Sequence, residues 1–370
     1  MKSRTPLLFL PFLSLAAPAL RAQEVLNWDD FELCNDCEIE ITELVRLGDA
    51  DGPGIIEGGG RLVAWDREHG YLVYPVNGAY IKVFGHDGTF QRKIGREGDG
   101  PGEFRGILDV DVVDGRIVVL DWMRGHIFIL SPTGEYITGH LYKYRPGHFT
   151  PAGDGRIVVT SSNWRSRVVE NPLQLIDLAS GATTLEFGAV NAGARKTDVE
   201  MLFGGQEEGS VLSRSGTVWW ASRPRPSVQE WSLEGEQLRV IEGELPWFPA
   251  ITEFPDRRRE PPETRWRGVA LDGDDNLWML VQTPDPEWDE IEMIPGPEGP
   301  QLPPGRGVDY RDNRIDVFSL RERRHLGRHV WDATGMALMD HGGEPAVSVL
   351  EYDDAMVPQI VVYRVRVKER

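Results

Sequence analysis

The sequence predicts an all-β fold, a six-bladed β-propeller with four antiparallel strands in each blade. Short runs in which Val, Ile, Trp, Tyr and Phe alternate with polar residues fill most of the chain, as half-buried strands require. These runs come in groups of four, and the groups repeat every 40 to 50 residues or so, which is typical of propellers. Helical periodicity is almost absent.

A glycine that ends a strand marks the repeat. It stands at Gly48, Gly95, Gly139, Gly188, Gly243 and Gly327, at intervals of 47, 44, 49, 55 and 84 residues. Because one repeat holds four strands, each interval predicts at least one blade.

The first two blades follow the pattern most clearly. In blade one the strands are "RLVAWD", "YLVYP", "AYIKVF" and "TFQRKIG". In blade two, "ILDVDVV" and "RIVVLD" are joined by the turn "DG", and "HIFIL" and "EYITGH" by "SPTG". Asp-Gly between two alternating runs is a strong hairpin signal.

The later blades diverge but keep the order of strands. Blade four reads "SVLSRSGTVWWAS", "SVQEWSL" and "EQLRVIEG", and blade five reads "RGVALDGDDNLWMLVQ", "NRIDVFSL" and "RHLGRHV". After blade five only three strands remain, "GMALMD", "AVSVLEYD" and "QIVVYRVRV". The missing outer strand is available at 38–48, "EIEITELVRLG", so we expect this N-terminal strand to join the last blade and close the ring, which leaves only short edges.

Three segments carry a family resemblance. "GREGDGPGEF", "GRIVVLD" and "RDNRIDVF" resemble NHL-type repeats, in which a Gly-rich loop ending in Phe leads into the inner strand. The resemblance covers nearly all of the chain as a blade pattern, with specific motifs in blades one, two and five. It implies a six-bladed propeller of a group that is mostly binding scaffold, with a minority of lyases and hydrolases.

The Gly-rich stretch 94–104, "IGREGDGPGEF", is interpreted as a connection between blades. It lacks the Lys and Ser/Thr of a phosphate loop, and the alternating oxygen ligands and terminal Glu of a calcium loop. Its glycines allow a tight crossing, and we expect Phe104 to lie buried between blades. For the acidic stretch 271–278, "LDGDDNLW", a hairpin turn is the plainer account.

The N-terminus predicts export. Lys2 and Arg4 precede an apolar run from Leu7 to Leu20, which reads as a signal peptide over residues 1–22, followed by a lead over 23–37 and a single propeller domain over 38–370. We therefore expect a soluble periplasmic or extracellular protein without a transmembrane segment. Loss of the three basic residues of 1–22 takes the formal charge from −19 to −22, which makes nucleic acid an unlikely partner.

The two cysteines, Cys34 and Cys37, stand in "CNDC". An oxidising compartment favours a local disulfide between them. A haem attachment would need His at position 38, where Glu38 stands, and a zinc site would need further ligands nearby.

The long segments 162–171, 191–209, 244–266 and 283–310 fall mostly on one face of the predicted propeller, where the inter-blade loops emerge. Long insertions on one face suggest that this face is functional. It is rich in Arg and Trp, which suit carboxylate, sugar or peptide recognition. The candidate ligand-binding residues are Trp122, Arg124, Trp164, Arg165, Arg223, Arg225, Trp247, Arg265, Trp266 and Arg267. Trp also fills blade seams, and Arg commonly pairs with surface acids.

No catalytic fingerprint appears, and no catalytic residue is assigned. The eight histidines do not recur at equivalent blade positions, so the three-histidine zinc site of NHL-like amidating lyases is not carried over. A calcium site of the lactonase kind would need acids near the axis, for which Asp109, Asp111 and Asp121 are candidates. No Ser-centred motif such as G-x-S-x-G is present.

We therefore expect an exported binding scaffold that takes a protein segment, a carbohydrate or another small ligand on its loop-rich face. No cofactor or metal is predicted. The alternative is a metal-assisted hydrolase or lyase with a site at the mouth of the central channel, and only this alternative would use calcium or zinc. A structural module of a cell-envelope assembly is a third interpretation. The oligomeric state, and the order and role of 283–310, are not determined by the sequence.

Overall fold

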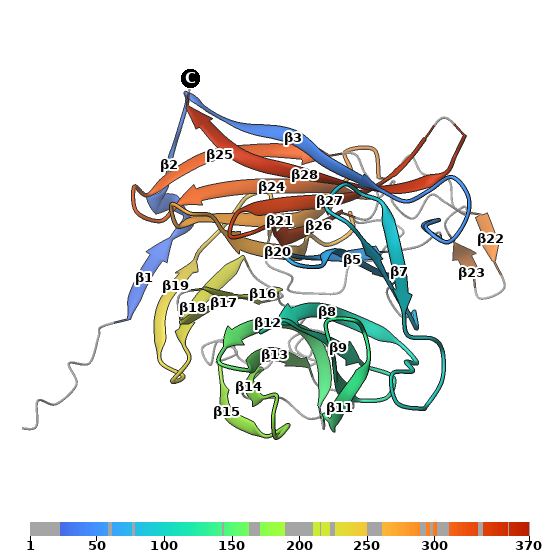
Figure 1. Ribbon diagram of the computed structural model, residues 1–370. Helices are drawn as coiled ribbons and strands as arrows, with labels where there is room; N and C mark the ends of the chain where they lie inside the picture. Colours follow the sequence, from blue (N-terminus) through green and yellow to red (C-terminus); the bar gives the residue numbers. More distant parts are fainter. Residues whose placement is uncertain are drawn as a thin grey trace, which may run out of the picture.

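The computed structural model is a ring of six four-stranded antiparallel sheets, which confirms the predicted six-bladed propeller (Figure 1). It describes residues 23–57, 61–75, 78–142, 144–162, 171–188, 210–214, 216–222, 226–249, 261–288, 294–296, 299–301, 311–331, 336–353 and 355–369. Within these residues the regular structure is β apart from one 3₁₀ turn, η1 (Trp28–Asp30). No helix of the described part is long and apolar enough to cross a membrane.

Each blade runs from an inner strand at the channel to an outer strand at the rim. Blade 1 consists of β4 (Arg61–Asp66), β5 (Gly70–Pro75), β6 (Ile81–Phe84) and β7 (Phe90–Ile94). Blade 2 consists of β8 (Ile107–Val113), β9 (Arg116–Asp121), β10 (His126–Leu130) and β11 (Tyr136–Leu141). Blade 3 consists of β12 (Arg145–Gly153), β13 (Arg156–Ser162), β14 (Leu173–Asp177) and β15 (Thr183–Phe187).

The second half of the ring follows the same order. Blade 4 consists of β16 (Ser210–Arg214), β17 (Thr217–Ser222), β18 (Ser227–Ser232) and β19 (Gln237–Glu242). Blade 5 consists of β20 (Arg265–Leu271), β21 (Asn276–Pro284), β24 (Arg311–Ser319) and β25 (Arg324–Trp331), with a small hairpin of β22 (Ile294–Gly296) and β23 (Gly299–Gln301) inserted before β24. Blade 6 consists of β26 (Met336–Asp340), β27 (Pro345–Tyr352), β28 (Pro358–Glu369) and β3 (Cys37–Leu47).

Ring closure is as predicted. Strand β3 pairs antiparallel with β28, so that Leu47 lies opposite Ile360 and Cys37 lies opposite Glu369. Figure 1 shows the first long strand, in blue, beside the last, in red. The two ends of the chain therefore share one sheet.

The lead before β3 is also built into the ring. Strand β1 (Glu24–Asn27) adds parallel to the outer edge of blade 4, and β2 (Glu32–Leu33) adds parallel to that of blade 5. Between them Trp28 and Phe31 are buried against Phe318 of blade 5. The sulfur atoms of Cys34 and Cys37 lie at bonding distance, 1.95 Å, where the chain turns from blade 5 to blade 6.

Six buried apolar clusters, one at each seam between neighbouring blades, hold the ring together. Phe104 is completely buried in the seam between blades 1 and 2, as predicted, and its ring lies edge-on to Phe128 at 5.5 Å. Gly95 has φ +76°, and a Cβ there would come within 2.3 Å of the Phe104 ring. The Gly-rich stretch is therefore a connector whose conformation only glycine permits.

The acidic stretch 271–278 is the hairpin turn between β20 and β21. One carboxylate oxygen of Asp272 accepts hydrogen bonds from the backbone N–H groups of Asp274 and Asn276. The other accepts from the Asn276 side chain and from the Trp278 indole N–H, both at 2.9 Å. Its acidic residues thus serve the turn itself.

Candidate functional site

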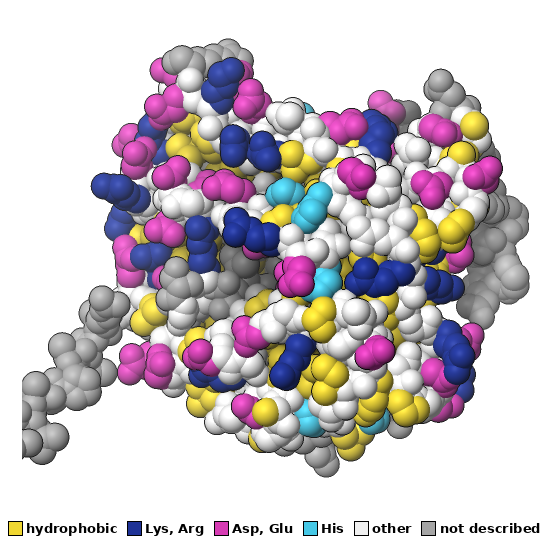
Figure 2. All heavy atoms as spheres, in the orientation of Figure 1, with side chains coloured by type: hydrophobic (Ala, Val, Ile, Leu, Met, Phe, Trp, Pro, Cys, Tyr) yellow, Lys and Arg dark blue, Asp and Glu magenta, His cyan; other side chains and the backbone are white. Residues whose placement is uncertain are grey.

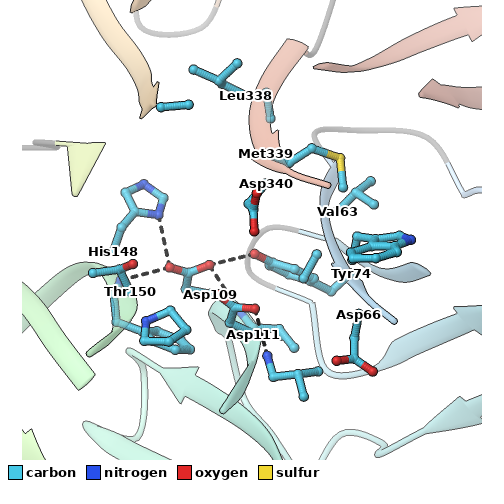
Figure 3. A pocket seen from close by; sticks show the side chains of 18 of the residues that line it. Val63, Asp66, Tyr74, Asp109, Asp111, His148, Thr150, Leu338, Met339 and Asp340 are labelled. Atoms are coloured by element: carbon cyan, nitrogen blue, oxygen red, sulfur yellow. Dashed lines mark hydrogen bonds and ion pairs between the residues drawn. The ribbon is translucent and has the colours of Figure 1, made fainter. Parts of the chain in front are cut away.

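A cavity of about 530 Å³ lies in the central channel, lined by the inner strands β4, β8, β12, β20 and β26 of five blades (Figure 3). Four aspartates line it: Asp66 of β4, Asp109 and Asp111 of β8, and Asp340 of β26. Its volume is in the range of small-molecule sites. Inner strands leave one edge facing the axis, so residues from distant parts of the chain converge here.

Asp109 joins three blades. One of its oxygens accepts a hydrogen bond from the Tyr74 hydroxyl of blade 1 at 2.7 Å. The other accepts from the backbone N–H of Phe149 in blade 3 at 2.9 Å and lies 3.4 Å from the His148 Nδ1. Burial, reinforced by the Asp109 charge, raises the pKa of Tyr74 well above its usual value. Tyr74 therefore stays protonated and donates, and both Asp109 oxygens are occupied.

Asp111, two residues further along β8, has fewer partners. One oxygen accepts a hydrogen bond from the Val112 N–H at 2.7 Å. Burial raises the pKa of Asp111 to about 7, although this hydrogen bond acts against it, and the charges of Asp109, Asp340 and Asp66 add to the rise. Near neutral pH this carboxyl group exists in both charge states.

Asp66 and Asp340 are each held through one oxygen by the turn that follows their strand. The Oδ1 of Asp66 accepts from the backbone N–H of Glu68 and of His69 at 2.8 and 2.9 Å. The Oδ1 of Asp340 accepts from the Gly343 N–H at 2.8 Å. Partial burial in the channel raises the pKa of Asp340, in part offset by the Gly343 hydrogen bond.

Among the described residues, no hydrogen bond reaches the Oδ2 atoms of Asp66, Asp111 and Asp340. Two basic side chains also line the cavity, Arg67 beside Asp66 and Arg267 of β20. The four carboxyl groups nevertheless outnumber the two guanidinium groups, so the cavity favours positive charge.

The four carboxyl groups come from three successive blades, 6, 1 and 2. Within the described part of the chain, no three His, Cys, Asp or Glu side chains are grouped closely enough to hold a metal ion.

The predicted ligand-binding residues fall into three groups. Trp164, Arg165, Arg223 and Arg225 lie outside the described residues. Trp122, Arg124, Trp247, Arg265 and Trp266 lie elsewhere than in the cavity lining, and Arg267 lines it. The structure does not test whether any of them touches a ligand.

Several of these side chains have internal partners. Trp266 is buried and packs against Phe248. The Arg314 guanidinium lies over the Trp247 ring, with its Cζ atom 3.8 Å from the ring centroid. Arg265 donates to Glu263. Each of these side chains therefore has a partner within the protein.

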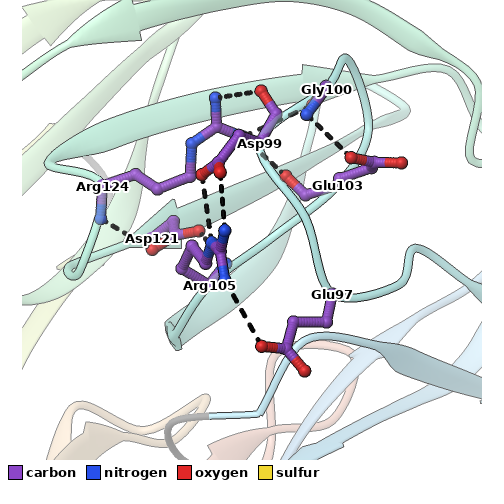
Figure 4. A network of polar contacts seen from close by, with 7 residues as sticks. All are labelled: Glu97, Asp99, Gly100, Glu103, Arg105, Asp121 and Arg124. Carbon is purple, nitrogen blue, oxygen red and sulfur yellow. Dashed lines mark hydrogen bonds and ion pairs between the residues drawn. The ribbon is translucent and has the colours of Figure 1, made fainter.

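Figure 4 shows the same for Arg124 and the Gly-rich connector. The Arg124 guanidinium donates to the backbone carbonyls of Asp99, Gly100 and Glu103. Asp121 accepts from the backbone N–H of Arg105, Gly106 and Arg124. Asp121 therefore organises the connector and does not line the cavity.

The sequence interpretation included Asp109 and Asp111 but missed Asp66 and Asp340. A signal was available, because "RLVAWD" and "MALMD" both end an inner strand in Asp. Equivalent strand ends from neighbouring blades meet at the same end of the channel. Over the face in view in Figure 2, acidic and basic side chains are interspersed, and no patch of one sign dominates.

No protein-family model matches the chain, and no curated protein matches it by sequence. Similar solved structures include a predicted exported protein from Bacteroides fragilis, with a TM-score of 0.58, 10% identity, and coverage of 93% of this chain and 99% of that one. A member of the DUF4221 family from Bacteroides vulgatus also has a TM-score of 0.58 at 10% identity, with coverage of 90% and 99%. A streptogramin B lyase has a TM-score of 0.47 at 12% identity, covering 89% and 98%. At these low identities the similarity shows the fold alone. No family model identifies the chain as an NHL-repeat protein.

Proposed function

We propose that this protein is an exported binding scaffold that holds a small organic cation, such as an amine, in its central channel. The observation that carries the proposal is a cavity of about 530 Å³ in which Asp111 is surrounded by the charges of Asp109, Asp340 and Asp66. A cation relieves the repulsion among these groups, whereas an anion increases it. Export is inferred from the apolar N-terminal stretch, and the structural likeness to a predicted exported protein is consistent with it.

An amine suits the chemistry of the lining. An ammonium group has several N–H donors, and the Oδ2 atoms of Asp66, Asp111 and Asp340 are acceptors from three successive blades, 1, 2 and 6. A charge-assisted hydrogen bond inside a partly desolvated cavity is stronger than one in bulk water. A ligand with two separated amino groups uses more than one of these carboxylates.

The test is calorimetric titration of the mature protein at pH 8 with 1,4-diaminobutane, and with 1,4-butanediol as an uncharged probe of the same length. We expect the diamine to bind at least tenfold more tightly than the diol. Asp111→Asn should weaken diamine binding by about tenfold, the loss of one charge-assisted contact. Asp154→Asn is the matched control, because the Asp154 side chain is 91% exposed outside the channel.

Equal affinity for the two probes, or unchanged diamine affinity in Asp111→Asn, would overturn the proposal. The dependence on pH is a second check. Since the pKa of Asp111 is about 7, the affinity for a cation should rise as the pH increases through that value.

A second candidate function is acid–base catalysis in the same cavity. A carboxyl group with a pKa near 7 is suited to general acid or base catalysis. Hydrolysis of a panel of lactones and glycosides, lost in Asp111→Asn and kept in Asp154→Asn, would favour this function. Equal activity in both variants would count against it.

The loop-rich face remains a predicted site for a protein segment or a carbohydrate. We rank it below the channel because Arg124, Trp247 and Arg265 have internal partners. Double substitution of Arg223 and Arg225 by Ala is the direct test, and an effect on partner capture but not on diamine binding would establish a separate surface.

A further inference from the structure

Asp66 of the channel is held by a histidine that does not line the channel. The Oδ1 of Asp66 accepts the backbone N–H of Glu68, the backbone N–H of His69 and the Nδ1 of the His69 ring, the last at 2.5 Å. All three donors come from the turn between β4 and β5. The carboxylate is therefore fixed by one oxygen, while Oδ2 has no hydrogen bond from the described residues.

The burial of His69 makes this contact informative. His69 is only 7% exposed, and its Nε2 is buried with no hydrogen-bond partner among the described residues. A side chain that merely fills space would fit this site better if it were apolar, because an unsatisfied buried nitrogen is unfavourable. The contact that accounts for a histidine here is the one from Nδ1 to Asp66.

We propose that His69 is a positioning residue for the channel site, holding the Asp66 carboxylate so that its Oδ2 is presented to a cationic ligand. The inference deepens the proposed function and rests on it. His69 acts through Asp66, because Asp66 lines the cavity and His69 does not.

Other groups around Asp66 leave this role to His69. Arg67 lies on the same turn, and Asp111 of β8 is close enough for its charge to respond to that of Asp66. His341 of blade 6 lies against the neighbouring Trp65 ring, with the ring centroids 4.4 Å apart, and shares a hydrogen bond with the Tyr71 hydroxyl. None of these three makes a hydrogen bond to Asp66 among those the described residues form.

The electrostatics agree with the geometry. Burial acts to raise the pKa of Asp66, but hydrogen bonds from the His69 side chain and from the N–H groups of His69 and Glu68 lower it by more. The pKa of Asp66 is therefore below its ordinary value, and the carboxylate stays charged in a cavity that holds three other acids.

The experiment compares His69→Leu with His69→Asn in the full chain. Asparagine places an N–H donor near the position of Nδ1, whereas leucine fills the space without one. We expect His69→Leu to weaken 1,4-diaminobutane binding by about tenfold at pH 5.5, and His69→Asn to restore most of it. In an Asp66→Asn background, His69→Leu should have no further effect.

A second readout needs no ligand. With ¹³C-labelled aspartate carboxyl groups, the Asp66 resonance, assigned by its loss in Asp66→Asn, should titrate at higher pH in His69→Leu than in the wild type. The Tm of His69→Leu should fall at neutral pH, because the folded protein loses a hydrogen bond to a charged carboxylate and the pKa of Asp66 rises toward its unfolded value. A purely space-filling role of His69 would leave the Asp66 titration in place.

The outcomes separate the two proposals. If the wild type binds no diamine but the Asp66 titration shifts, the channel ligand is wrong and the His69–Asp66 coupling stands without that ligand. If the diamine binds and His69→Leu changes neither the affinity nor the Asp66 titration, the positioning role is overturned.

Discussion

The hydroxyl of Tyr74 in blade 1 donates a 2.7 Å hydrogen bond to the carboxylate of Asp109 in blade 2. The same carboxylate accepts the Phe149 N–H of blade 3. A single side chain thus connects three blades where they meet at the channel. Because the contact is buried and involves a charged group, its loss should be measurable in the stability of the whole ring.

Tyr74→Phe should lower the free energy of unfolding by about 1.5 to 3 kcal/mol, the range for a hydrogen bond to a charged group. Urea unfolding measures it. Tyr136→Phe is the matched control, because Tyr136 is 41% exposed on the outer strand of blade 2 and should tolerate the change. Equal effects of the two substitutions would contradict a special role for the Tyr74 hydroxyl.

Asp111 should make the protein less stable as the pH rises from about 4 to about 7. Its pKa in the folded protein, about 7, lies above that of an unfolded aspartate, about 3.9. In this interval the unfolded chain releases the proton while the folded protein retains it, so the stability contributed below the unfolded pKa is lost as the pH rises.

Asp111→Asn removes this dependence. Its stability relative to the wild type should increase between pH 4 and pH 7 by up to about 4 kcal/mol, because each pKa unit corresponds to about 1.4 kcal/mol. Taking the difference between the two proteins cancels the opposite trend from His329 and His341, whose pKa values burial lowers. Parallel stability curves for the two proteins would show that Asp111 titrates normally.

Gly95→Ala should destabilise the blade connector more than a positive φ alone requires. Gly95 and Gly115 have similar φ values, +76° and +73°, but an added Cβ meets the Phe104 ring at Gly95 and open space at Gly115. We expect Gly115→Ala to lower the free energy of unfolding by about 1 to 2 kcal/mol, and Gly95→Ala by a further ~1 to 3 kcal/mol from overpacking. Similar losses at both sites would mean that Phe104 moves aside without cost.

Reduction of the Cys34–Cys37 pair should lower the Tm. The pair closes a loop with a sequence separation of three residues, for which the loss of chain entropy on closure corresponds to about 2 kcal/mol. Thermal melts with and without a phosphine reductant measure the change. The double substitution Cys34→Ser and Cys37→Ser should melt at the lower temperature and be insensitive to the reductant, and a wild type that does not respond would show that the pair is not oxidised.

The blade seam at Phe104 and the closing strand can be predicted because the sequence patterns that indicate them are local. Phe104 was expected in the seam between blades, and it is completely buried there. The strand 38–48 was expected to complete the last blade, and β3 does pair with β28. Additions by β1 and β2 to the rims of blades 4 and 5 were not expected, because strands of two to four residues carry almost no periodicity.

The candidate site depends more on the tertiary structure, and the reason is physical. The Arg and Trp residues of the loop-rich face are candidates by residue type, and residue type does not show which of them have a partner within the protein. Arg124 has such partners, because its guanidinium donates to three backbone carbonyls. Asp121, chosen with Asp109 and Asp111, likewise holds backbone N–H groups of the connector.

The sequence by itself determined the number of blades, their strand order, the closing strand and the glycine connectors, because alternation and turn chemistry act over a few neighbouring residues. The tertiary structure alone decided that Asp66, Asp109, Asp111 and Asp340 share one cavity and that a buried histidine holds one of them. Those side chains are distant along the chain and meet only when the ring closes. Their charges therefore interact through the geometry of the channel, which no local pattern encodes.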